Sequence, residues 1–209
     1  MKLIIFGASR GVGRSLTEFA LAQDHQVTAF VRNPSSLNLN NSLLTVVSGD
    51  VTNAADVGQA IRGHEMVFCT LGQDQRGATT LYSVAAQHIT QAMNKQGIRR
   101  LVFLSNFGVL GETASNFRTA FTVSLAKLLL RGTLDDHRRA LGELQKYSWE
   151  WLAVRPMGLT DGERTGRYRI ALEGLPEGGT RISRADDADF MLKQVGSDEY
   201  VHKIPSIAY

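Results

Sequence analysis

The chain has 209 residues, of which 43% are hydrophobic and 21% are charged, and its formal net charge is +3. This length provides for one sizeable core and is short for two, so we expect a single domain over residues 1–209. The sequence has no long run of Lys and Arg and none interleaved with aromatic residues, which argues against a nucleic-acid-binding surface. Its weak net positive charge favours an anionic ligand instead.

Cysteine usage and apolar runs predict a cytoplasmic protein without a membrane partner. Cys69 is the only cysteine, so it has no internal disulfide partner. The first apolar stretch is short and leads straight into glycines, unlike a secretory leader. The longest later apolar stretch, residues 121–130, contains a lysine and is well below the length of a membrane span.

The first thirteen residues, MKLIIFGASRGVG, organise the rest of the sequence. Residues 3–6 form a short apolar run, typical of a strand buried on both faces of a parallel sheet. Glycines follow in the order G-x-x-x-G-x-G, and helical spacing of apolar residues begins inside this turn. A strand, a glycine turn and a helix in this order let a dinucleotide pyrophosphate lie at the helix N-terminus. We therefore predict dinucleotide contacts from the turn: Gly7, Ser9, Arg10, Gly11, Val12 and Gly13.

Strands and amphipathic helices alternate along the remaining chain. Apolar runs predict strands at residues 26–31, 43–48, 66–71, 101–104 and 151–154. Helical spacing predicts helices that begin near Val12, Asn53, Leu81, Phe117, Thr133 and Ser183. Residues 168–172 and 180–183 are expected to pair as a hairpin. Alternating strands and helices form right-handed βαβ units, so the predicted fold class is α/β, a doubly wound Rossmann fold with a mostly parallel sheet flanked by helices.

The predicted second strand ends where NAD enzymes carry an acidic residue that binds the ribose 2′-hydroxyl. Arg32 occupies that place, and Arg10 adds a cation in the glycine turn. A guanidinium pairs bidentately with a 2′-phosphate, so we predict NADPH (NADP⁺) rather than NAD. Asp50 can accept a hydrogen bond from the adenine amine with Val51 against the ring, although a plain turn aspartate is an equal alternative. Arg76 is a further candidate for the 2′-phosphate, with a solvated loop residue as the alternative.

Ligands of such sheets bind beyond the carboxyl ends of the strands. We expect the residues at these ends to surround the nicotinamide: Leu71, Gly72, Ser105, Pro156 and Met157. Ser105 is the candidate catalytic residue, positioned to orient a substrate or the carboxamide; a strand-end turn former is the alternative. His137 lies on an apolar helical stripe, where a core histidine is expected more often than a proton donor. No metal site is predicted.

The tyrosines point to the kind of hydride acceptor. None of the five tyrosines is followed by a lysine four residues later. The Tyr-x-x-x-Lys pair that protonates alcohols and ketones in most short-chain dehydrogenases is therefore missing. A flavin, quinone or other extended conjugated system, which takes hydride without strong proton donation from the protein, fits better.

Eight motifs, in order, carry a resemblance to a known family: GASRGVG, FVRN, SGDV, TLGQ, LSNFG, DDHRRAL, VRPMGLTDG and ISRADDADFML. They resemble the atypical short-chain dehydrogenases, and within these the biliverdin-IXβ reductase/flavin reductase (NADPH) group. The resemblance covers nearly the whole chain and implies a monomer in which NADPH gives hydride to loosely held planar acceptors. It leaves open whether the acceptor is biliverdin or a free flavin (FMN, riboflavin).

The resemblance also implies roles for individual residues. It implies cofactor contacts at Gly7, Arg10, Gly13 and Arg32, adenosine contacts at Asp50, Val51, Leu71 and Gly72, and an active-site role for Ser105. The substrate wall is expected from loops around residues 105–132 and 156–183. Acceptor contacts are expected there and on the following helix: Phe107, Val109, Leu110, Arg118, His137, Gly158 and Leu159. Arg164 and Arg167 are further candidates for the anionic groups of the acceptor.

Two rival functions remain open. The first is a non-catalytic NADP(H)-sensing regulatory protein of the same fold, in which the apolar segment 117–130 docks a partner. The second is an epimerase or ketone reductase, against which the missing Tyr-x-x-x-Lys pair argues.

Overall fold

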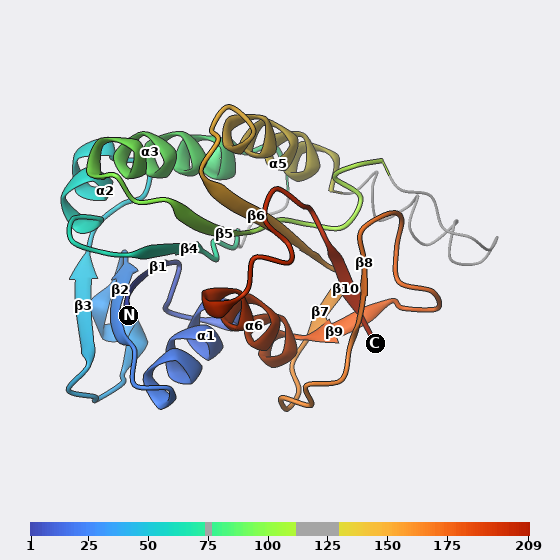
Figure 1. Cartoon of the computed structure of the whole chain (residues 1–209), viewed down its shortest axis with the longest axis horizontal. Coiled ribbons are helices and arrows are strands. Elements are labelled where there is room, and N and C mark those ends of the chain that lie inside the picture. Colours follow the sequence, from blue (N-terminus) through green and yellow to red (C-terminus); the bar gives the residue numbers. More distant parts are fainter. Residues whose placement is uncertain (74–76, 112–129) are drawn as a thin grey trace.

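The computed structural model describes residues 1–73, 77–111 and 130–209 (Figure 1). Its central sheet has eight strands in the order β3-β2-β1-β4-β5-β6-β10-β8. Their bounds are Lys2–Phe6 (β1), Gln26–Val31 (β2), Leu44–Ser48 (β3), Met66–Cys69 (β4), Arg100–Leu104 (β5), Glu150–Pro156 (β6), Arg169–Ala171 (β8) and Ser206–Ala208 (β10). Only the β10–β8 pair is antiparallel among the strand pairs of the described chain, so the predicted α/β fold with a mostly parallel sheet is confirmed.

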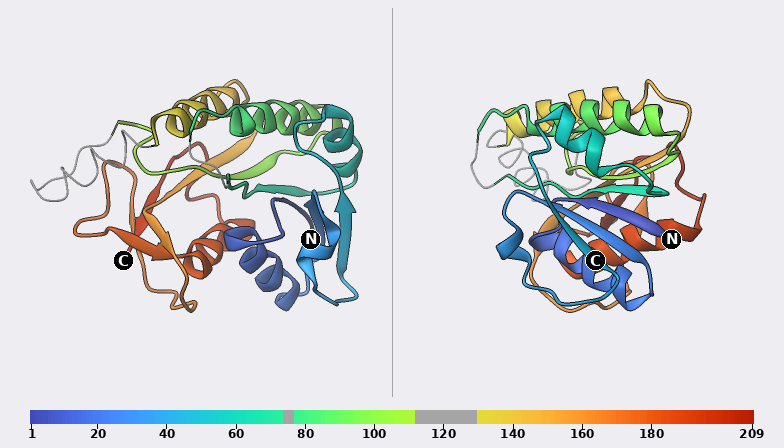
Figure 2. Two further views of the ribbon diagram at one scale, coloured as in Figure 1. Left: turned by 180° about the vertical axis from the view of Figure 1, so that it is seen from behind. Right: turned by 90° about the vertical axis from the view of Figure 1, so that its left-hand side faces the viewer.

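Helices cover both faces of this sheet (Figures 1 and 2). On one face lie α1 (Gly11–Ala22) and α6 (Arg184–Lys193), and on the other α2 (Ala54–Ala60), α3 (Leu81–Gln96) and α5 (Arg131–Leu144). Two short 3₁₀ helices, η1 (Pro34–Leu37) and η2 (Gln194–Gly196), complete the helical elements of the described residues. The sheet therefore separates two apolar cores, one under each helical layer.

The first strand shows how the sequence pattern produces this layering. Successive side chains of a strand point to opposite faces of the sheet. Leu3 and Ile5 pack in the core beneath α1 and α6, whereas Ile4 and Phe6 pack in the core beneath α2, α3 and α5. Residues 3–6 are all 0% exposed, which confirms the predicted strand buried on both faces.

Parallel register brings the ends of several strands to one edge. Phe6 of β1 is paired with Phe30 of β2 and Cys69 of β4, and Cys69 is paired with Phe103 of β5. Because these strands run in the same direction, the residues that follow them are neighbours at the carboxyl edge. The glycine turn, Arg32 and Ser105 therefore converge, although they lie far apart in the sequence.

The expected hairpin between residues 168–172 and 180–183 is wrong. β8 pairs antiparallel with β10, and β9 (Arg181–Ser183) pairs parallel with β7 (Gly158–Thr160) in a separate two-stranded sheet. Each of these strands has three residues, too few for an alternating pattern to identify its partner. The partners come from distant segments, and β10 was not predicted.

Two of the expected helix starts are confirmed by their caps, and a third is displaced. Asn53 Oδ1 accepts a hydrogen bond from the Ala55 N–H at 2.9 Å, and Ser183 Oγ accepts one from the Asp186 N–H at 3.0 Å. The N-cap expected at Thr133 is wrong by three residues, because α5 begins at Arg131 with Leu130 as its N-cap. The Thr133 hydroxyl is instead 3.4 Å from the Gly77 carbonyl, a tertiary contact. The helix expected from Phe117 lies outside the described residues.

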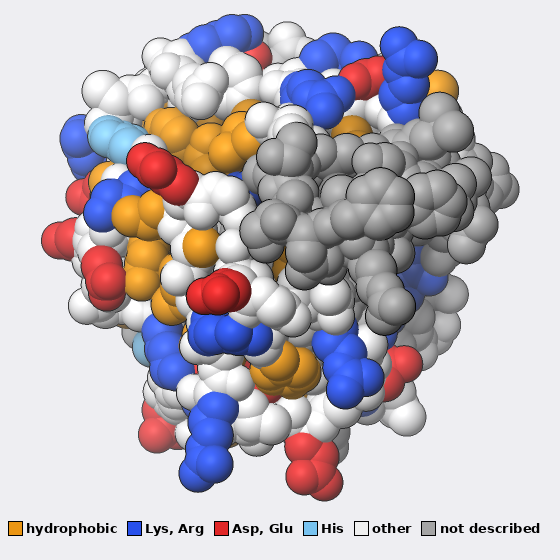
Figure 3. Space-filling model, turned by 90° about the vertical axis from the view of Figure 1, so that its right-hand side faces the viewer, with side chains coloured by type: hydrophobic (Ala, Val, Ile, Leu, Met, Phe, Trp, Pro, Cys, Tyr) orange, Lys and Arg blue, Asp and Glu red, His pale blue; other side chains and the backbone are white. Residues whose placement is uncertain are grey.

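On the face shown in Figure 3, Lys and Arg side chains are scattered among Asp and Glu rather than gathered in one basic area. Within residues 1–73, 77–111 and 130–209, no helix has the length and apolar character needed to cross a bilayer.

Candidate functional site

A cavity of about 540 Å³ lies at the carboxyl edge of the sheet. Residues at or just after the ends of β1 to β5 line it, together with the first turns of α1, α3 and α6, one residue of α5 and one of β7. Its lining runs from Arg32 and Asp50 beside β2 and β3 to Ser105 and Leu159 beside β5 and β7. The position is the one at which doubly wound sheets bind nucleotides.

The glycine turn forms the central part of the cavity wall. Gly7 has φ +88°, and a Cβ there would lie 2.8 Å from the Thr70 carbonyl oxygen. A Cβ on Gly13 would overlap the carbonyl oxygen of Gly7 and the hydroxyl of Thr70. Only glycine at these positions lets α1 approach β1 and β4 so closely.

The N-terminus of α1 is suited to an anion. Gly11 and Val12, in its first turn, line the cavity. The N-cap residue Arg10 makes no side-chain capping bond, and the first turn carries no acidic residue. Backbone N–H groups at a helix start and the helix dipole together favour phosphate. The residues present therefore fit a dinucleotide pyrophosphate.

One end of the cavity carries positive charge near a single carboxylate. Arg10 and Arg32 line this end, and Asp50 lies beside them. Hydrogen bonds from the backbone and hydroxyl of Thr52 lower the pKa of Asp50, and the nearby charge of Arg32 lowers it further. Asp50 Oδ1 accepts both Thr52 bonds, at 2.8 and 2.7 Å. This end offers two guanidinium groups and one ionised acceptor, with Val51 as an apolar wall.

The other end is buried and holds polar atoms without partners. Ser105 is 5% exposed, and its Oγ has no hydrogen-bond partner within the described part of the chain. His137 is 2% exposed, and its Nδ1 likewise lacks a partner among the described residues. Both residues line the cavity. An unsatisfied buried polar group costs about 1–3 kcal/mol, so a ligand that supplies hydrogen bonds here is favoured.

The imidazole of His137 is a neutral group. Burial lowers its pKa to about 4, so the ring carries no charge at neutral pH. It stacks on Tyr82 with a centroid separation of 3.8 Å, and burial raises the pKa of the Tyr82 phenol. These two rings provide hydrogen-bonding and stacking surface, and the raised pKa makes the Tyr82 phenol a weaker acid than an ordinary tyrosine. His137 is thus a buried histidine, as the sequence favoured, and it also borders the cavity.

Asp136 accepts hydrogen bonds from the start of α3, next to the two stacked rings, and this role was not identified from the sequence. It is 0% exposed; its Oδ2 accepts the Tyr82 N–H at 2.8 Å and its Oδ1 accepts the Ser83 hydroxyl. The N-cap residue of α3, Thr80, makes no side-chain capping bond, so Asp136 of α5 supplies the acceptor from across the helix pair. The sequence shows Asp136 beside His137, but only the fold brings it to α3.

Arg184 is a second residue that sequence reasoning missed. It is the first residue of α6 and lines the cavity. Its Cδ lies 3.5 Å from where a Cβ of Gly11 would be, so it stands directly over the glycine turn. Its guanidinium forms an ion pair with Asp161 at 2.7 Å. The sequence predicts α6 but carries no signal that α6 packs beside α1 (Figure 1).

The structure brings most of the predicted cofactor residues to the cavity. Its lining includes the following predicted residues: Gly7, Ser9, Arg10, Gly11, Val12, Arg32, Asp50, Val51, Leu71, Gly72, Ser105, His137 and Leu159. Gly13 lies directly behind this lining, against Gly7 and Thr70. Arg76 and Arg118 lie outside the described residues.

Pro156 at the end of β6 and the two residues after it lie away from the cavity lining. Pro156 is paired with Ile207 of β10, and the Met157 N–H donates to the Ile207 carbonyl at 3.1 Å. Both side chains are buried beside this unpredicted strand and do not line the cavity within the described chain. Gly158 packs against β9, where a Cβ would lie 3.1 Å from the Thr180 carbonyl oxygen.

The loop after β5 folds back onto α5. Arg138 Nε donates to the Val109 carbonyl at 2.8 Å, and Val109 packs in the core at 2% exposure. Leu110 is 52% exposed and Phe107 is half-buried. None of these three apolar residues lines the cavity in the described structure.

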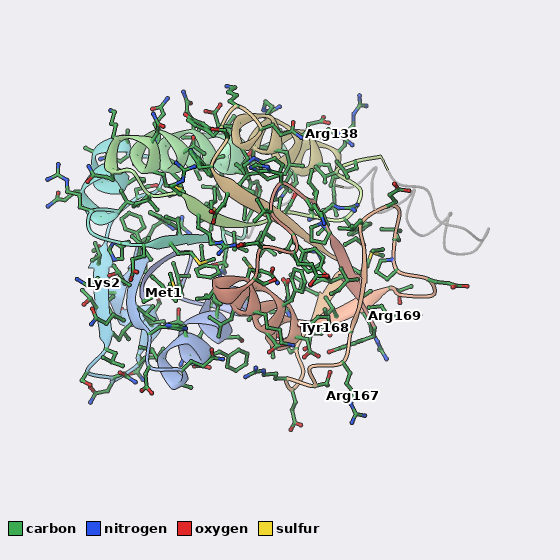
Figure 4. All side chains as sticks on the ribbon, in the orientation of Figure 1. Met1, Lys2, Arg138, Arg167, Tyr168 and Arg169 are labelled. Atoms are coloured by element: carbon green, nitrogen blue, oxygen red, sulfur yellow. The ribbon has the colours of Figure 1, made fainter. Side chains whose placement is uncertain are left out.

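Arg164 and Arg167 also lie away from the cavity. Arg164 Nε donates to Asp189 at 2.8 Å, and its guanidinium lies 4.8 Å from the centre of the Phe19 ring. Arg164 therefore ties its loop to α1 and α6. Arg167 is exposed and projects outward from the molecule (Figure 4).

Comparisons with known proteins agree with this geometry. Residues 7–198 match a family described as NAD(P)H-binding. The chain is 26% identical over 197 residues to 3-beta-hydroxysteroid dehydrogenase of Mycolicibacterium neoaurum, covering 87% of this chain and 54% of that protein. A second relative, sterol demethylase protein B of Methylococcus capsulatus, is 26% identical over 126 residues. The chain spans about half or less of the length of these curated relatives.

Solved structures share the fold over the whole chain. A short-chain dehydrogenase/reductase from Veillonella parvula in complex with NADP has a TM-score of 0.81 at 19% identity, covering 100% of this chain and 94% of that one. An anaerobillin reductase from Escherichia coli O157:H7 has a TM-score of 0.79 at 22% identity, covering 100% and 96%. At these identities the likeness shows the fold.

Proposed function

The chain belongs to the NAD(P)H-binding family and has an oxidoreductase-type Rossmann fold, and on this premise we propose that it is an NADPH-dependent reductase. Its acceptor is a planar conjugated molecule, biliverdin (IXβ-type) or a free flavin such as FMN or riboflavin. Bound NADPH supplies a hydride at the nicotinamide C4. The protein binds, orients and shields the two partners.

The choice of NADPH rests on the positive end of the cavity. Arg10 and Arg32 line the wall next to the glycine turn, where the adenosine half of a dinucleotide lies in doubly wound folds. A 2′-phosphate carries charge that two guanidinium groups can bind bidentately. In this proposal Asp50, whose Oδ1 already accepts two hydrogen bonds from Thr52, accepts from the adenine amine rather than from a ribose hydroxyl.

The observation that carries the acceptor class is the chemistry of the buried end. Ser105, His137 and Tyr82 line it, and burial holds both rings in their neutral states. They can hydrogen-bond and stack on a flat molecule, and the sequence has no Tyr-x-x-x-Lys pair to make a tyrosine a strong acid. Conjugated acceptors distribute the transferred charge and take their proton from water, so proximity and orientation do most of the work.

The fold likeness to an anaerobillin reductase supports a bilin as one acceptor to test. The likeness to a hydroxysteroid dehydrogenase supports a sterol as the comparison substrate. A steroid ketone needs a proton donor that none of the tyrosines supplies through a Tyr-x-x-x-Lys pair.

The test is consumption of NADPH by the purified protein with biliverdin, FMN, riboflavin and a 3-ketosteroid in parallel. Turnover with a bilin or a flavin, and none with the steroid, is the expected result. Turnover of the steroid alone would overturn the acceptor class. Tight NADPH binding without turnover of any acceptor would favour the non-catalytic regulator instead.

A further inference from the structure

Arg184 lines the cavity but has no role in the proposed binding of NADPH by Arg10, Arg32 and the N-terminus of α1. It comes from α6, on the opposite side of the glycine turn from Arg32 and β2. Its aliphatic stem contacts the space above Gly11, the residue that begins α1. In a dinucleotide bound across the sheet edge, the atoms nearest this position are those of the pyrophosphate.

The present partner of Arg184 is easily exchanged. Asp161, which accepts from Arg184 Nη1 at 2.7 Å, has a side chain that is 96% exposed. Ion pairs with so exposed a partner contribute little, because water solvates the carboxylate almost as well. A pyrophosphate held by the first turn of α1 offers two negative charges in a fixed position, which a guanidinium binds through two parallel hydrogen bonds.

We propose that Arg184 is a pyrophosphate ligand of the bound dinucleotide and that it exchanges Asp161 for the phosphate when the cofactor binds. The two helices that pack on one face, α1 and α6, then hold the same group: α1 through its backbone N–H groups and α6 through this side chain. The inference rests on the proposed use of a dinucleotide, but it is independent of the acceptor and of the choice between NADPH and NADH.

If Arg184 binds the pyrophosphate and Arg32 binds the 2′-phosphate, substituting each residue has a different effect on the binding of NADPH and of NADH. Both NADPH and NADH carry the pyrophosphate, whereas only NADPH carries the 2′-phosphate. Arg184→Ala is therefore expected to weaken the binding of both cofactors by the same factor, about tenfold, the value of one charge-assisted pair. Arg32→Ala is expected to weaken NADPH binding by about tenfold and to leave NADH binding unchanged.

Arg14→Ala is the matched control. Arg14 and Arg184 have the same side-chain exposure, 35%, and each is ion-paired to a carboxylate, Glu18 in the case of Arg14. Arg14 does not line the cavity within the described residues. Asp161→Asn removes the competing carboxylate and is expected to tighten both cofactors by about twofold to threefold.

The experiment is equilibrium titration of wild type and these four variants with NADPH and with NADH, after circular dichroism has shown that each variant is folded. Equal weakening in Arg184→Ala, with Arg14→Ala unchanged, supports the assignment. Unchanged binding in Arg184→Ala, weakening confined to NADPH, or weaker binding in Asp161→Asn would overturn it. If wild type binds neither cofactor, the proposed function itself fails, and the two failures are thus distinguishable.

Discussion

Ser105 places a polar hydroxyl directly after the apolar strand β5. Its N–H is used by the sheet, donating to the Val154 carbonyl at 2.7 Å, while its Oγ has no partner in the described structure. Removing a buried hydroxyl that makes no hydrogen bond relieves a desolvation cost. If Ser105 is only structural, its substitution by alanine lowers the free energy of unfolding and leaves turnover unchanged. If Ser105 binds the ligand, the same substitution lowers turnover and leaves the free energy of unfolding equal or higher.

We expect Ser105→Ala to lower the turnover number by about tenfold, the effect of losing one hydrogen bond of ordinary net strength to the reacting molecules. The free energy of unfolding is expected to stay equal or to rise, and NADPH affinity to change little. Steady-state kinetics and denaturant unfolding of the same preparation measure these quantities. A loss of stability with unchanged turnover would identify Ser105 as a turn former only.

His137 makes the stability of the protein depend on pH. Because burial lowers its pKa to about 4, the folded state disfavours the protonated ring, whereas the unfolded chain takes up the proton at ordinary values. Between about pH 6.5 and pH 4 the unfolded state binds more protons. Stability contributed by the neutral ring is thus present above this window and is lost as the pH falls through it.

The expected size of that loss is about 3 kcal/mol over the window. His137→Gln, which does not titrate, is expected to show a smaller fall in unfolding free energy between pH 7 and pH 4. Chemical denaturation of wild type and variant at several pH values is the measurement. Parallel pH curves for the two proteins would show that His137 is not the group responsible.

At the scale of elements, α3 and α5 are joined by a cap that neither helix contains alone. Asp136 lies in α5 and bonds the first turn of α3, while its neighbour Asp135 is 46% exposed and pairs with Arg138 three residues later. Asp136 also pairs with an arginine three residues later, Arg139, at 3.0 Å, so the two adjacent aspartates differ mainly in that Asp136 is buried and caps α3. This pair offers a close comparison of a buried cap with a surface ion pair.

Asp136→Ala is expected to destabilise the protein by about 2–3 kcal/mol, because the Tyr82 N–H and the Ser83 hydroxyl lose a buried acceptor. Asp135→Ala is expected to cost less than about 0.5 kcal/mol. Urea unfolding of both variants tests the difference. Equal losses of stability would contradict a structural role for the cap across the helix pair.

The same contrast between local and distant partners explains what the sequence predicts. β1 to β6 were predictable because each is an apolar run with Gly, Asn, Pro or Ser shortly after its end. α2 and α6 were predictable because Asn53 and Ser183 are local caps. β7 to β10 have three residues each and pair with remote segments, so their partners were not readable. A Cβ on Gly132 would lie 2.7 Å from the Cα of Ala78, which is distant in the sequence, so the pattern around Gly132 could not predict this contact.

At the scale of the whole molecule, the site combines residues from Gly7 to Arg184. Its cofactor side follows from rules of doubly wound folds, since strand ends and the glycine turn locate Arg32, Asp50 and Ser105. Its other contributors, Tyr82, Asp136 and Arg184, depend on how helices pack, which the sequence does not state. Phe107, Val109, Leu110 and Gly158 were expected at the acceptor, and Pro156 and Met157 at the nicotinamide. These residues do not line the cavity in the described structure, where α5 and β10 contact their segments.

The most direct test of the proposed reductase compares the rates at which wild-type protein oxidises NADPH and NADH with biliverdin and with FMN. The proposal predicts turnover of at least one of these acceptors, with NADPH preferred over NADH by about tenfold or more, the value of the 2′-phosphate contacts. Equal rates with both cofactors would contradict the role given to Arg10 and Arg32. No oxidation of either cofactor by any planar acceptor would contradict the reductase itself.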